Sequence, residues 1–164
     1  MNKWIGFLPL DNIYEMAKMH NLSPSLIGAM VSIESNGNPY ATRYESDYRY
    51  LVDIERFAKL SNISFQTEVI HQKTSWGLMQ VMGGVAREHF FKESLTSLVK
   101  PKRSLHIGCL HYKKFLMQHE NESDAISAYN QGGPYKTERG EYKNQWYVNA
   151  VLKRKKELQD LIYG

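Results

Sequence analysis

Residues 26–39 read LIGAMVSIESNGNP, and this stretch decides how the chain folds. It begins with an apolar run of helical length. Ser23 and Pro24 come just before the run and are a favourable N-cap and a favourable first helical residue. Glu34 follows the run, and the turn signal SNGNP comes directly after it. The pattern therefore predicts a mostly buried helix that ends at Glu34.

A carboxylate at the C-terminal end of a buried helix is subject to two effects. Desolvation disfavours its ionised form, and the negative end of the helix dipole acts in the same direction. Both raise the pKa of Glu34, and a carboxylic acid that keeps its proton near neutral pH is what a glycosidase uses as a general acid. Taken alone, the position also fits a surface glutamate in a helix-terminal turn.

The composition indicates a globular protein. The chain has 164 residues, of which 42% are hydrophobic and 12% aromatic, so we predict one folded domain over residues 1–164. Eleven tyrosines and three tryptophans fit either a groove that stacks on sugars or a tyrosine-rich core. The net charge of +4 suits an anionic polymer such as a cell wall, and it suits nucleic acid equally well.

Several absences also shape the expectations. Cys109 is the only cysteine, so no intrachain disulfide can form, and we expect this residue in the core. The six histidines lack zinc-ligand spacing, so we expect no metal and no cofactor. The apolar N-terminal stretch is too short for a signal peptide, and no segment reaches transmembrane length. We therefore expect a monomer that is made in the cytoplasm and does not insert stably into membranes.

The hydrophobic periodicity predicts a mainly α fold with at most a small β-hairpin, near residues 43–50. The expected helices cover residues 10–20, 24–34, 48–60, 65–72, 78–90, 101–119, 121–130 and 142–161. Three turn-rich segments interrupt this pattern, each next to a predicted helix: ESNGNP (34–39), SWGLMQVM (75–82) and AYNQGG (128–133). Because helix ends that converge can form a cleft, we predict that the three segments build one site.

These segments resemble the soluble-lytic-transglycosylase (SLT) domain, which is related to goose-type lysozyme and occurs in bacterial wall enzymes and many bacteriophage proteins. That family carries Glu-Ser at a helix end with Asn-Pro shortly after, then Gly-Leu-Met-Gln-(Ile/Val)-Met, then Ala-Tyr-Asn-x-Gly. Here the matching residues are 34–35 with 38–39, 77–82 and 128–132. The resemblance covers about residues 10–155 and implies a lysozyme-like multi-helix domain.

The chain also departs from the family pattern. The serine that often precedes the Gly-Leu-Met-Gln motif has no clear match in residues 71–76, and His111 stands where a tyrosine is usual. The segment Arg43-Tyr44-Glu45 resembles a phage-associated subgroup. Together with the expected absence of a signal peptide, this resemblance fits a phage lysis protein that is released to the wall, or a virion component.

The resemblance implies peptidoglycan glycan strands as the partner and Glu34 as both general acid and general base. Such an enzyme cleaves the β-1,4 bond between N-acetylmuramic acid and N-acetylglucosamine and leaves a 1,6-anhydro sugar. The residues it places at the substrate are Ser35, Gln80, Met82, Tyr129, Asn130 and Tyr147.

For several of these residues two interpretations stay open. Met82 can line the groove or belong to a helix core, and for Met79 we expect the core. Tyr129 can hydrogen-bond Glu34, pack below the sugar, or be a buried tyrosine with a satisfied hydroxyl. Tyr147 is a further candidate for contact with Glu34, and Trp76 can stack on sugar or close the core.

Glu45 opens an alternative mechanism, because many glycosidases use two carboxylates. If Glu45 faces Glu34 across a suitable gap, it can activate water, and the protein is then a hydrolytic muramidase. A chitinase-like hydrolase on the same scaffold is related to this interpretation. The alternative role for Glu45 is an ion pair with Arg43 or Arg49. A non-catalytic wall-binding virion module and a basic nucleic-acid-binding helical domain are further hypotheses, and the latter does not explain the three motifs.

Overall fold

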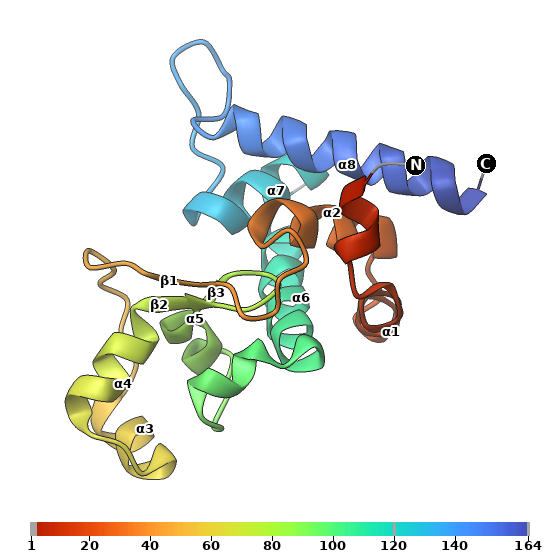
Figure 1. The fold of residues 1–164 in the computed structure, drawn as a ribbon. Helices are drawn as coiled ribbons and strands as arrows, with labels where there is room; N and C mark the ends of the chain where they lie inside the picture. The colour runs from red at the N-terminus through yellow and green to blue at the C-terminus, as the bar shows by residue number, and fades with distance from the viewer. Residues whose placement is uncertain (1–2, 120, 164) are drawn as a thin grey trace.

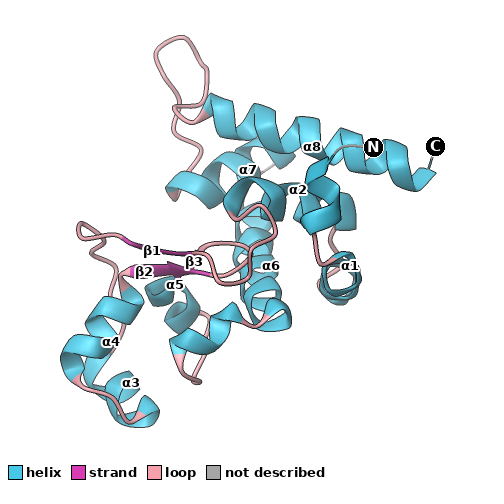
Figure 2. Cartoon of the chain, viewed as in Figure 1, coloured by secondary structure: helices cyan, strands magenta, loops and turns pink. Residues whose placement is uncertain are grey.

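The computed structural model describes residues 3–119 and 121–163 and consists of helices around one small sheet (Figures 1 and 2). Short 3₁₀ helices η1 (Lys3–Phe7) and η2 (Leu95–Val99) precede α1 and α6. The α-helices are α1 (Leu10–Met19), α2 (Pro24–Glu34), α3 (Ile54–Ser61), α4 (Phe65–Gln72), α5 (Gly83–Glu88), α6 (Pro101–Gln118), α7 (Glu122–Gln131) and α8 (Gln145–Tyr163). The predicted mainly α class is confirmed.

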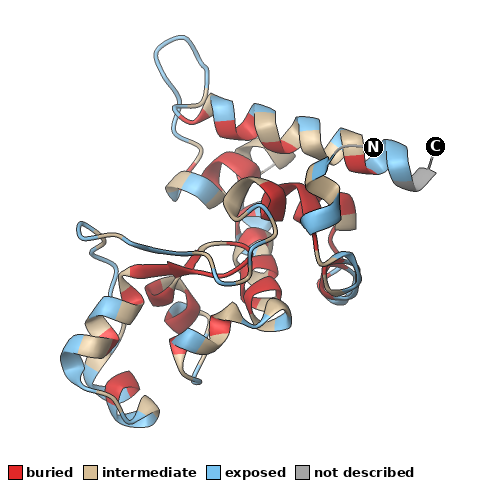
Figure 3. Ribbon diagram, in the orientation of Figure 1, coloured by how far each residue is buried: buried red, intermediate tan, exposed pale blue. Residues whose placement is uncertain are grey.

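Helix α2 forms the centre of the core, and every residue from Ser25 to Ser32 is buried (Figure 3). The backbone N–H of Leu26 donates to the Ser23 hydroxyl, so the predicted N-cap is confirmed. Helix α8 packs along α2 more extensively than any other pair of helices in the described structure. The two backbones can approach closely because Gly28 has no side chain, and a Cβ there would lie 2.9 Å from a Leu158 methyl group.

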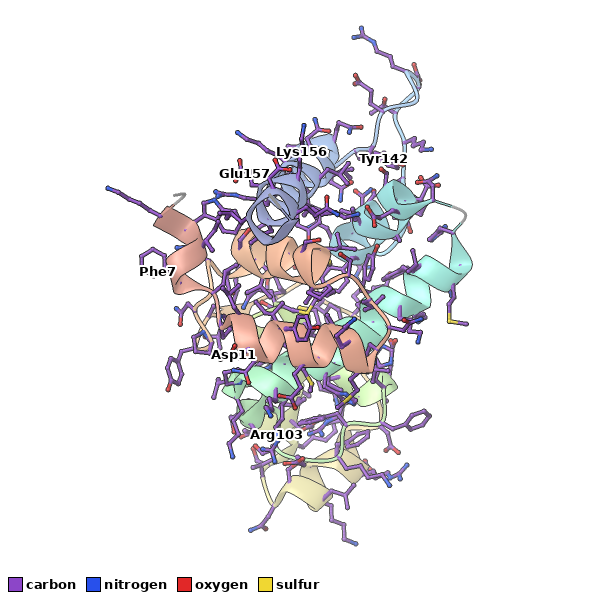
Figure 4. The ribbon with its side chains drawn as sticks, turned by 90° about the vertical axis from the view of Figure 1, so that its right-hand side faces the viewer. Phe7, Asp11, Arg103, Tyr142, Lys156 and Glu157 are labelled. Carbon is purple, nitrogen blue, oxygen red and sulfur yellow. The ribbon has the colours of Figure 1, made fainter. Side chains whose placement is uncertain are left out.

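Seen from the side, α8, α2 and α1 lie one above the other, with η1 at their edge (Figure 4). Phe7 projects from η1 away from these helices and is 64% exposed. The buried side chains of α1 are Ile13, Met16 and Ala17, which recur at helical spacing on one face. The core therefore consists of helix faces stacked on the nearly all-buried α2.

The sheet differs from the predicted hairpin at residues 43–50. It has three antiparallel strands in the order β1 (Thr42–Tyr44), β2 (Thr74–Trp76) and β3 (Val81–Met82). Arg43 pairs with Ser75, so β1 takes its partner from a distant part of the chain instead of folding back on itself. The prediction was wrong because local sequence carries no signal for this long-range pairing.

The predicted helix over residues 78–90 is also wrong in its first part. Residues 77–80 form a turn with positive φ at Gly77 and Gln80, β3 follows, and the helix begins only at Gly83. Gly83 meets the backbone of α4 so closely that a Cβ would clash with the His71 carbonyl oxygen. Gly83 is therefore a site of close packing within the stretch predicted as helix.

The other helices agree with the prediction to within a few residues, with one further exception. Helix α3 begins at Ile54 and not near Tyr48. The Gln72 side chain accepts from the Val52 N–H at 2.7 Å and donates to its carbonyl at 2.8 Å. Since Val52 hydrogen-bonds this side chain, its backbone groups are not free for a helical ladder.

A buried ion pair joins α4 to α5. Arg87 Nε donates to Glu68 Oε1 at 2.8 Å, and both side chains are completely buried. The guanidinium also donates to the carbonyls of Phe91 and Glu93 and lies 4.3 Å from the centre of the Phe57 ring. Through Arg87, this cluster joins α5 to α3, to α4 and to the segment that follows α5.

We expect Glu68→Gln to lower the free energy of unfolding by about 3 kcal/mol or more, because it leaves the Arg87 charge buried without a counter-charge. Urea unfolding followed by circular dichroism measures the change. The control is Glu15→Gln, which removes the same charge from the exposed Lys102–Glu15 pair and should change stability by less than about 1 kcal/mol. Equal effects in the two variants would contradict the structural role of the buried pair.

Candidate active site

Glu34 is the last residue of α2, and its side chain meets α8. The Tyr147 hydroxyl donates to Glu34 Oε1 at 2.5 Å, and Tyr147 itself is only 1% exposed. Glu34 is half-buried. The carboxyl group is therefore held at one oxygen by a rigid buried donor, which leaves Oε2 for a different partner.

Burial is the largest influence on the pKa of Glu34 and raises it from 4.5 to about 7. The hydrogen bond from Tyr147 and the positive charge of Arg43 both act in the opposite direction and lower this pKa. The upward shift that the sequence predicts from desolvation is therefore present. Near neutral pH the group is divided between its acid and its carboxylate form, as a residue that alternates between acid and base requires.

Ser35 connects the end of α2 to the turn at residues 77–80. Its hydroxyl lies 2.8 Å from the Leu78 carbonyl oxygen and 3.2 Å from that of Val31, and it donates to both. The Leu78 side chain is fully buried, so this turn is anchored in the core. Ser35 thus fixes the position of Glu34 relative to the Gly-Leu-Met-Gln motif.

The Gln80 side chain binds protein groups at both ends of its amide. Nε2 donates to the carbonyls of Ala41 and Gly77, both at 2.9 Å, and Oε1 accepts from the Ser75 hydroxyl at 2.9 Å. Both N–H groups are thus in use, so a donation from Gln80 to sugar requires one of these bonds to open. Gln80 stabilises its own left-handed backbone turn and connects it to the segment before β1.

Tyr129, on α7, reaches the same turn from the other side. Its hydroxyl donates to the Met79 carbonyl oxygen at 2.7 Å, and its ring lies beside those of His111 and Tyr112. Burial and the nearby charge of Glu34 raise the pKa of Tyr129 well above its ordinary value. Of the three roles open for Tyr129, the structure shows the satisfied hydroxyl, and it places the ring near Glu34.

Asn130 lies next to Tyr129 and is exposed. Its Oδ1 atom accepts from Asn144 Nδ2 at 2.9 Å. Within the described part of the chain, Asn130 Nδ2 has no hydrogen-bond acceptor. The nitrogen of this amide is therefore available to donate to a bound molecule.

Arg43 and Glu45 contribute charges from β1 and its end. Arg43 Nε donates to Glu45 Oε1, and the pair is largely exposed. The backbone N–H of Glu45 donates to the Lys73 carbonyl at 2.8 Å, which fixes the chain where it leaves the sheet. The positive charge of Arg43 also lowers the pKa of Glu34, so this one guanidinium group acts on both carboxylates.

The site is thus built where α2, α7, α8, β1 and the turn at residues 77–80 meet. The family model for the transglycosylase SLT domain matches residues 11–147 of this chain. The chain belongs to the SLT transglycosylase family. None of the curated proteins compared with it matches. Family membership indicates a glycan-cleaving transglycosylase that acts on peptidoglycan, and it confirms the lysozyme-like fold inferred from the three motifs.

The other residues singled out in the sequence lie in the core of the SLT domain or at its edge. Met79 is fully buried, as expected, whereas Met82 is half-buried in β3. Trp76 is buried, and its indole N–H donates to the His71 carbonyl at 2.9 Å, so this ring closes the core. Cys109 lies buried on α6, as expected.

Two residues near the site were missed as functional candidates. Asn144 is 5% exposed and orients Asn130, but its only sequence signal is an amide residue in the first turn of the helix predicted over residues 142–161. The sequence offers Arg43 only as a partner for Glu45 and as part of the phage-like segment, although its charge also lowers the pKa of Glu34. Asn144 lies 14 residues after Asn130 and Arg43 lies nine residues after Glu34, and periodicity does not reveal which side chains the intervening turns bring together.

Two absences over residues 3–119 and 121–163 complete the description of the SLT domain. No group of three or more His, Cys, Asp or Glu side chains in these ranges is placed to hold a metal ion. In the same ranges, no helix has both the length and the apolar character that are needed to cross a membrane.

We expect Tyr147→Phe to raise the pKa of Glu34 further above about 7, because the lost hydrogen bond stabilises the carboxylate. Titration of the Glu34 side-chain carboxyl by ¹³C NMR measures this shift. Tyr142→Phe is the matched control, since it removes a hydroxyl that donates to a different carboxylate, Asp124, at 2.6 Å. A Glu34 pKa that stays unchanged in Tyr147→Phe would contradict the assigned hydrogen bond.

Proposed function

We propose that this SLT domain is a lytic transglycosylase that cleaves the β-1,4 bond between N-acetylmuramic acid and N-acetylglucosamine in peptidoglycan. The observation that carries the proposal is that the Glu34 carboxyl group has a raised pKa and a fixed position. Its carboxyl group is buried enough to have a pKa of about 7, and Tyr147 holds one of its oxygens in place. One such group can donate a proton and later remove one.

In the proposed reaction Glu34 acts first as an acid. It gives its proton to the bridging oxygen while the bond between that oxygen and the anomeric carbon of the muramic sugar breaks. Because Tyr147 occupies Oε1, the proton leaves from Oε2. The acetamide oxygen of the same sugar attacks the anomeric carbon and stabilises the positive charge that develops there.

Glu34 then acts as a base. Its carboxylate removes the proton from the 6-hydroxyl of the muramic sugar, whose oxygen attacks the anomeric carbon and displaces the acetamide oxygen. The product is a 1,6-anhydro sugar, Glu34 regains its proton, and no water is consumed. A single protein carboxylate suffices for both steps, which agrees with the pairing of Glu45 to Arg43.

Substrate contacts in this proposal fall mainly to Asn130, whose free amide donates to the acetamide carbonyl and holds it near the anomeric carbon. Met82 offers a partly exposed apolar wall. Ser35, Gln80 and Tyr129 act through the turn at residues 77–80, because their polar groups already bind its backbone or its neighbours.

We also propose that the enzyme is monomeric and reaches the wall as a phage lysis protein or as part of a virion. The support is the resemblance of Arg43-Tyr44-Glu45 to a phage-associated subgroup. The net charge of +4 adds to it, because it favours approach to an anionic wall.

Glu34→Gln tests the central assignment. We expect the rate of peptidoglycan cleavage to fall by about 10²–10⁴-fold, since the amide can neither donate nor remove the transferred proton. Mass spectrometry of wild-type digests identifies the reaction. Anhydro ends support transglycosylation, whereas reducing ends indicate hydrolysis. Unchanged cleavage by Glu34→Gln would remove the assignment.

The same variant should be more stable than the wild-type protein above neutral pH. The folded state keeps the Glu34 proton between pH 4.5 and about 7, whereas the unfolded chain releases it, so wild-type stability falls as pH rises through this interval. Glu34→Gln lacks this loss and should be more stable than wild type at pH 8 by on the order of 2 kcal/mol. At pH 4 the two proteins should unfold alike.

Glu45→Gln separates the one-carboxylate mechanism from the two-carboxylate alternative. We expect kcat to stay within about threefold of wild type, because Glu34 is the only carboxylate that takes part in the proposed reaction. Asp47→Asn, which neutralises a nearby exposed carboxylate, is the control. Collapse of activity in a folded Glu45→Gln protein, together with reducing ends in wild-type digests, would establish hydrolysis.

A further inference from the structure

Asn144 is a buried polar residue for which the proposed reaction has no direct use. It lies just before α8, and its backbone carbonyl accepts from the Tyr147 N–H at 2.9 Å, so it begins the first turn of that helix. Its side chain is buried, with only 5% of the residue exposed. A buried amide needs partners for both its oxygen and its nitrogen, and these partners fix which way it faces.

Ser127 on α7 supplies the partners that orient Asn144. The Ser127 hydroxyl donates to Asn144 Oδ1 at 2.7 Å, and Asn144 Nδ2 donates to the Ser127 carbonyl at 3.1 Å. A backbone carbonyl can only accept, so the atom of Asn144 that faces it must be the nitrogen. Gln131 Nε2 donates to the Ser127 hydroxyl at 3.0 Å, which directs the hydroxyl proton toward Asn144.

The orientation of Asn144 in turn fixes the orientation of the Asn130 amide. The same Asn144 nitrogen donates to Asn130 Oδ1 at 2.9 Å, and the Asn130 oxygen is thereby turned inward. The amide is planar, so its Nδ2 group must then face the other way, on the exposed side of the residue. The buried network thus decides that Asn130 presents two N–H donors, and not an acceptor, to the surroundings.

The same turn of α8 also reaches Glu34. Tyr147 lies three residues after Asn144, and side chains at this spacing are neighbours on a helix. Tyr147 holds Glu34 Oε1 while Asn144 holds Asn130 Oδ1. One helical turn therefore holds both the proposed acid, through Tyr147, and the Asn130 amide, through Asn144.

The loop between α7 and α8 is also fixed to α7. The hydroxyl of Tyr142, which is labelled in Figure 4, donates to Asp124 at 2.6 Å. Lys136 forms an ion pair with the same carboxylate at 3.4 Å. These bonds restrain the chain on the N-terminal side of Asn144. Its position next to Asn130 does not depend on the helix alone.

We propose that Asn144 is a positioning residue of the active site, which locks the amide of Asn130 with its N–H groups toward the substrate so that they bind the carbonyl oxygen of the N-acetyl group. The inference rests on the proposed function, because an acetamide is the acceptor to be bound. With Asn130 reversed, its oxygen would meet the acetamide oxygen, and two acceptors repel.

A double-mutant cycle with Asn130 tests this role. We expect Asn144→Ala to lower kcat/KM for peptidoglycan about tenfold, the size of one hydrogen bond, and Asn130→Ala to do the same. The double variant should also be about tenfold below wild type, because Asn144 acts only through Asn130. A hundredfold loss in the double variant would overturn the proposal, since it would mean that Asn144 supports the fold independently.

Asn144→Asp serves as a second variant that keeps the shape of the side chain. Its carboxylate still accepts from the Ser127 hydroxyl but can donate neither to the Ser127 carbonyl nor to Asn130, so Asn130 should turn round and donate to it. Proton exchange of the Asn130 side-chain amide, identified by its absence from spectra of Asn130→Ala, should be fast in wild type and slower in Asn144→Asp. Equal exchange rates would overturn the proposal.

Gln145→Ala is the matched control on the same turn, because that side chain binds the Tyr142 N–H and Asn149 but not Asn130. It should leave both kcat/KM and the exchange of the Asn130 amide at wild-type values. If wild type does not cleave peptidoglycan but the exchange pattern is as expected, the proposed function fails while the orientation of Asn130 by Asn144 stands. If wild type cleaves peptidoglycan but the exchange does not change in Asn144→Asp, the proposed function stands and the positioning role of Asn144 fails.

Discussion

The hydrogen bond from Tyr147 to Glu34 joins α8 to the end of α2, the two helices with the most extensive contact in the fold. It exists because α2 is apolar over nearly its whole length and brings its final residue out of water as it packs. The same burial that stabilises α2 disfavours a carboxylate at Glu34. The core therefore generates an acid that keeps its proton near neutral pH, and Tyr147 limits how far the pKa rises.

The three family motifs are joined to one another by hydrogen bonds. Ser35 donates to the carbonyl of Leu78, and Tyr129 donates to that of Met79, so the first and third motifs both bind the backbone of the second. Gln80 in turn connects this turn to the segment before β1. Three segments that are distant in sequence are thus held as one unit by hydrogen bonds among their own residues.

Where local sequence settles the backbone, the prediction agrees with the structure. Ser23 with Pro24, Pro101 and Asn121 mark helix starts through their own chemistry, and these helices begin as expected. Residues 78–82 belong to a helix predicted from the sequence, yet hydrogen bonds to other segments and close packing make them part of a turn and a strand. Their conformation depends on partners that no local window contains.

The sequence by itself determined that the fold is mainly α, that Glu34 ends a buried helix, and that its pKa is raised, because each follows from apolar periodicity and desolvation along a short stretch of chain. It also supplied the motifs that place the chain among SLT transglycosylases. Only the tertiary structure decided which side chains act on Glu34 and which face of Asn130 is presented. Those choices depend on hydrogen bonds from Tyr147 and Asn144, whose geometry is fixed only when α8 packs against α2 and α7.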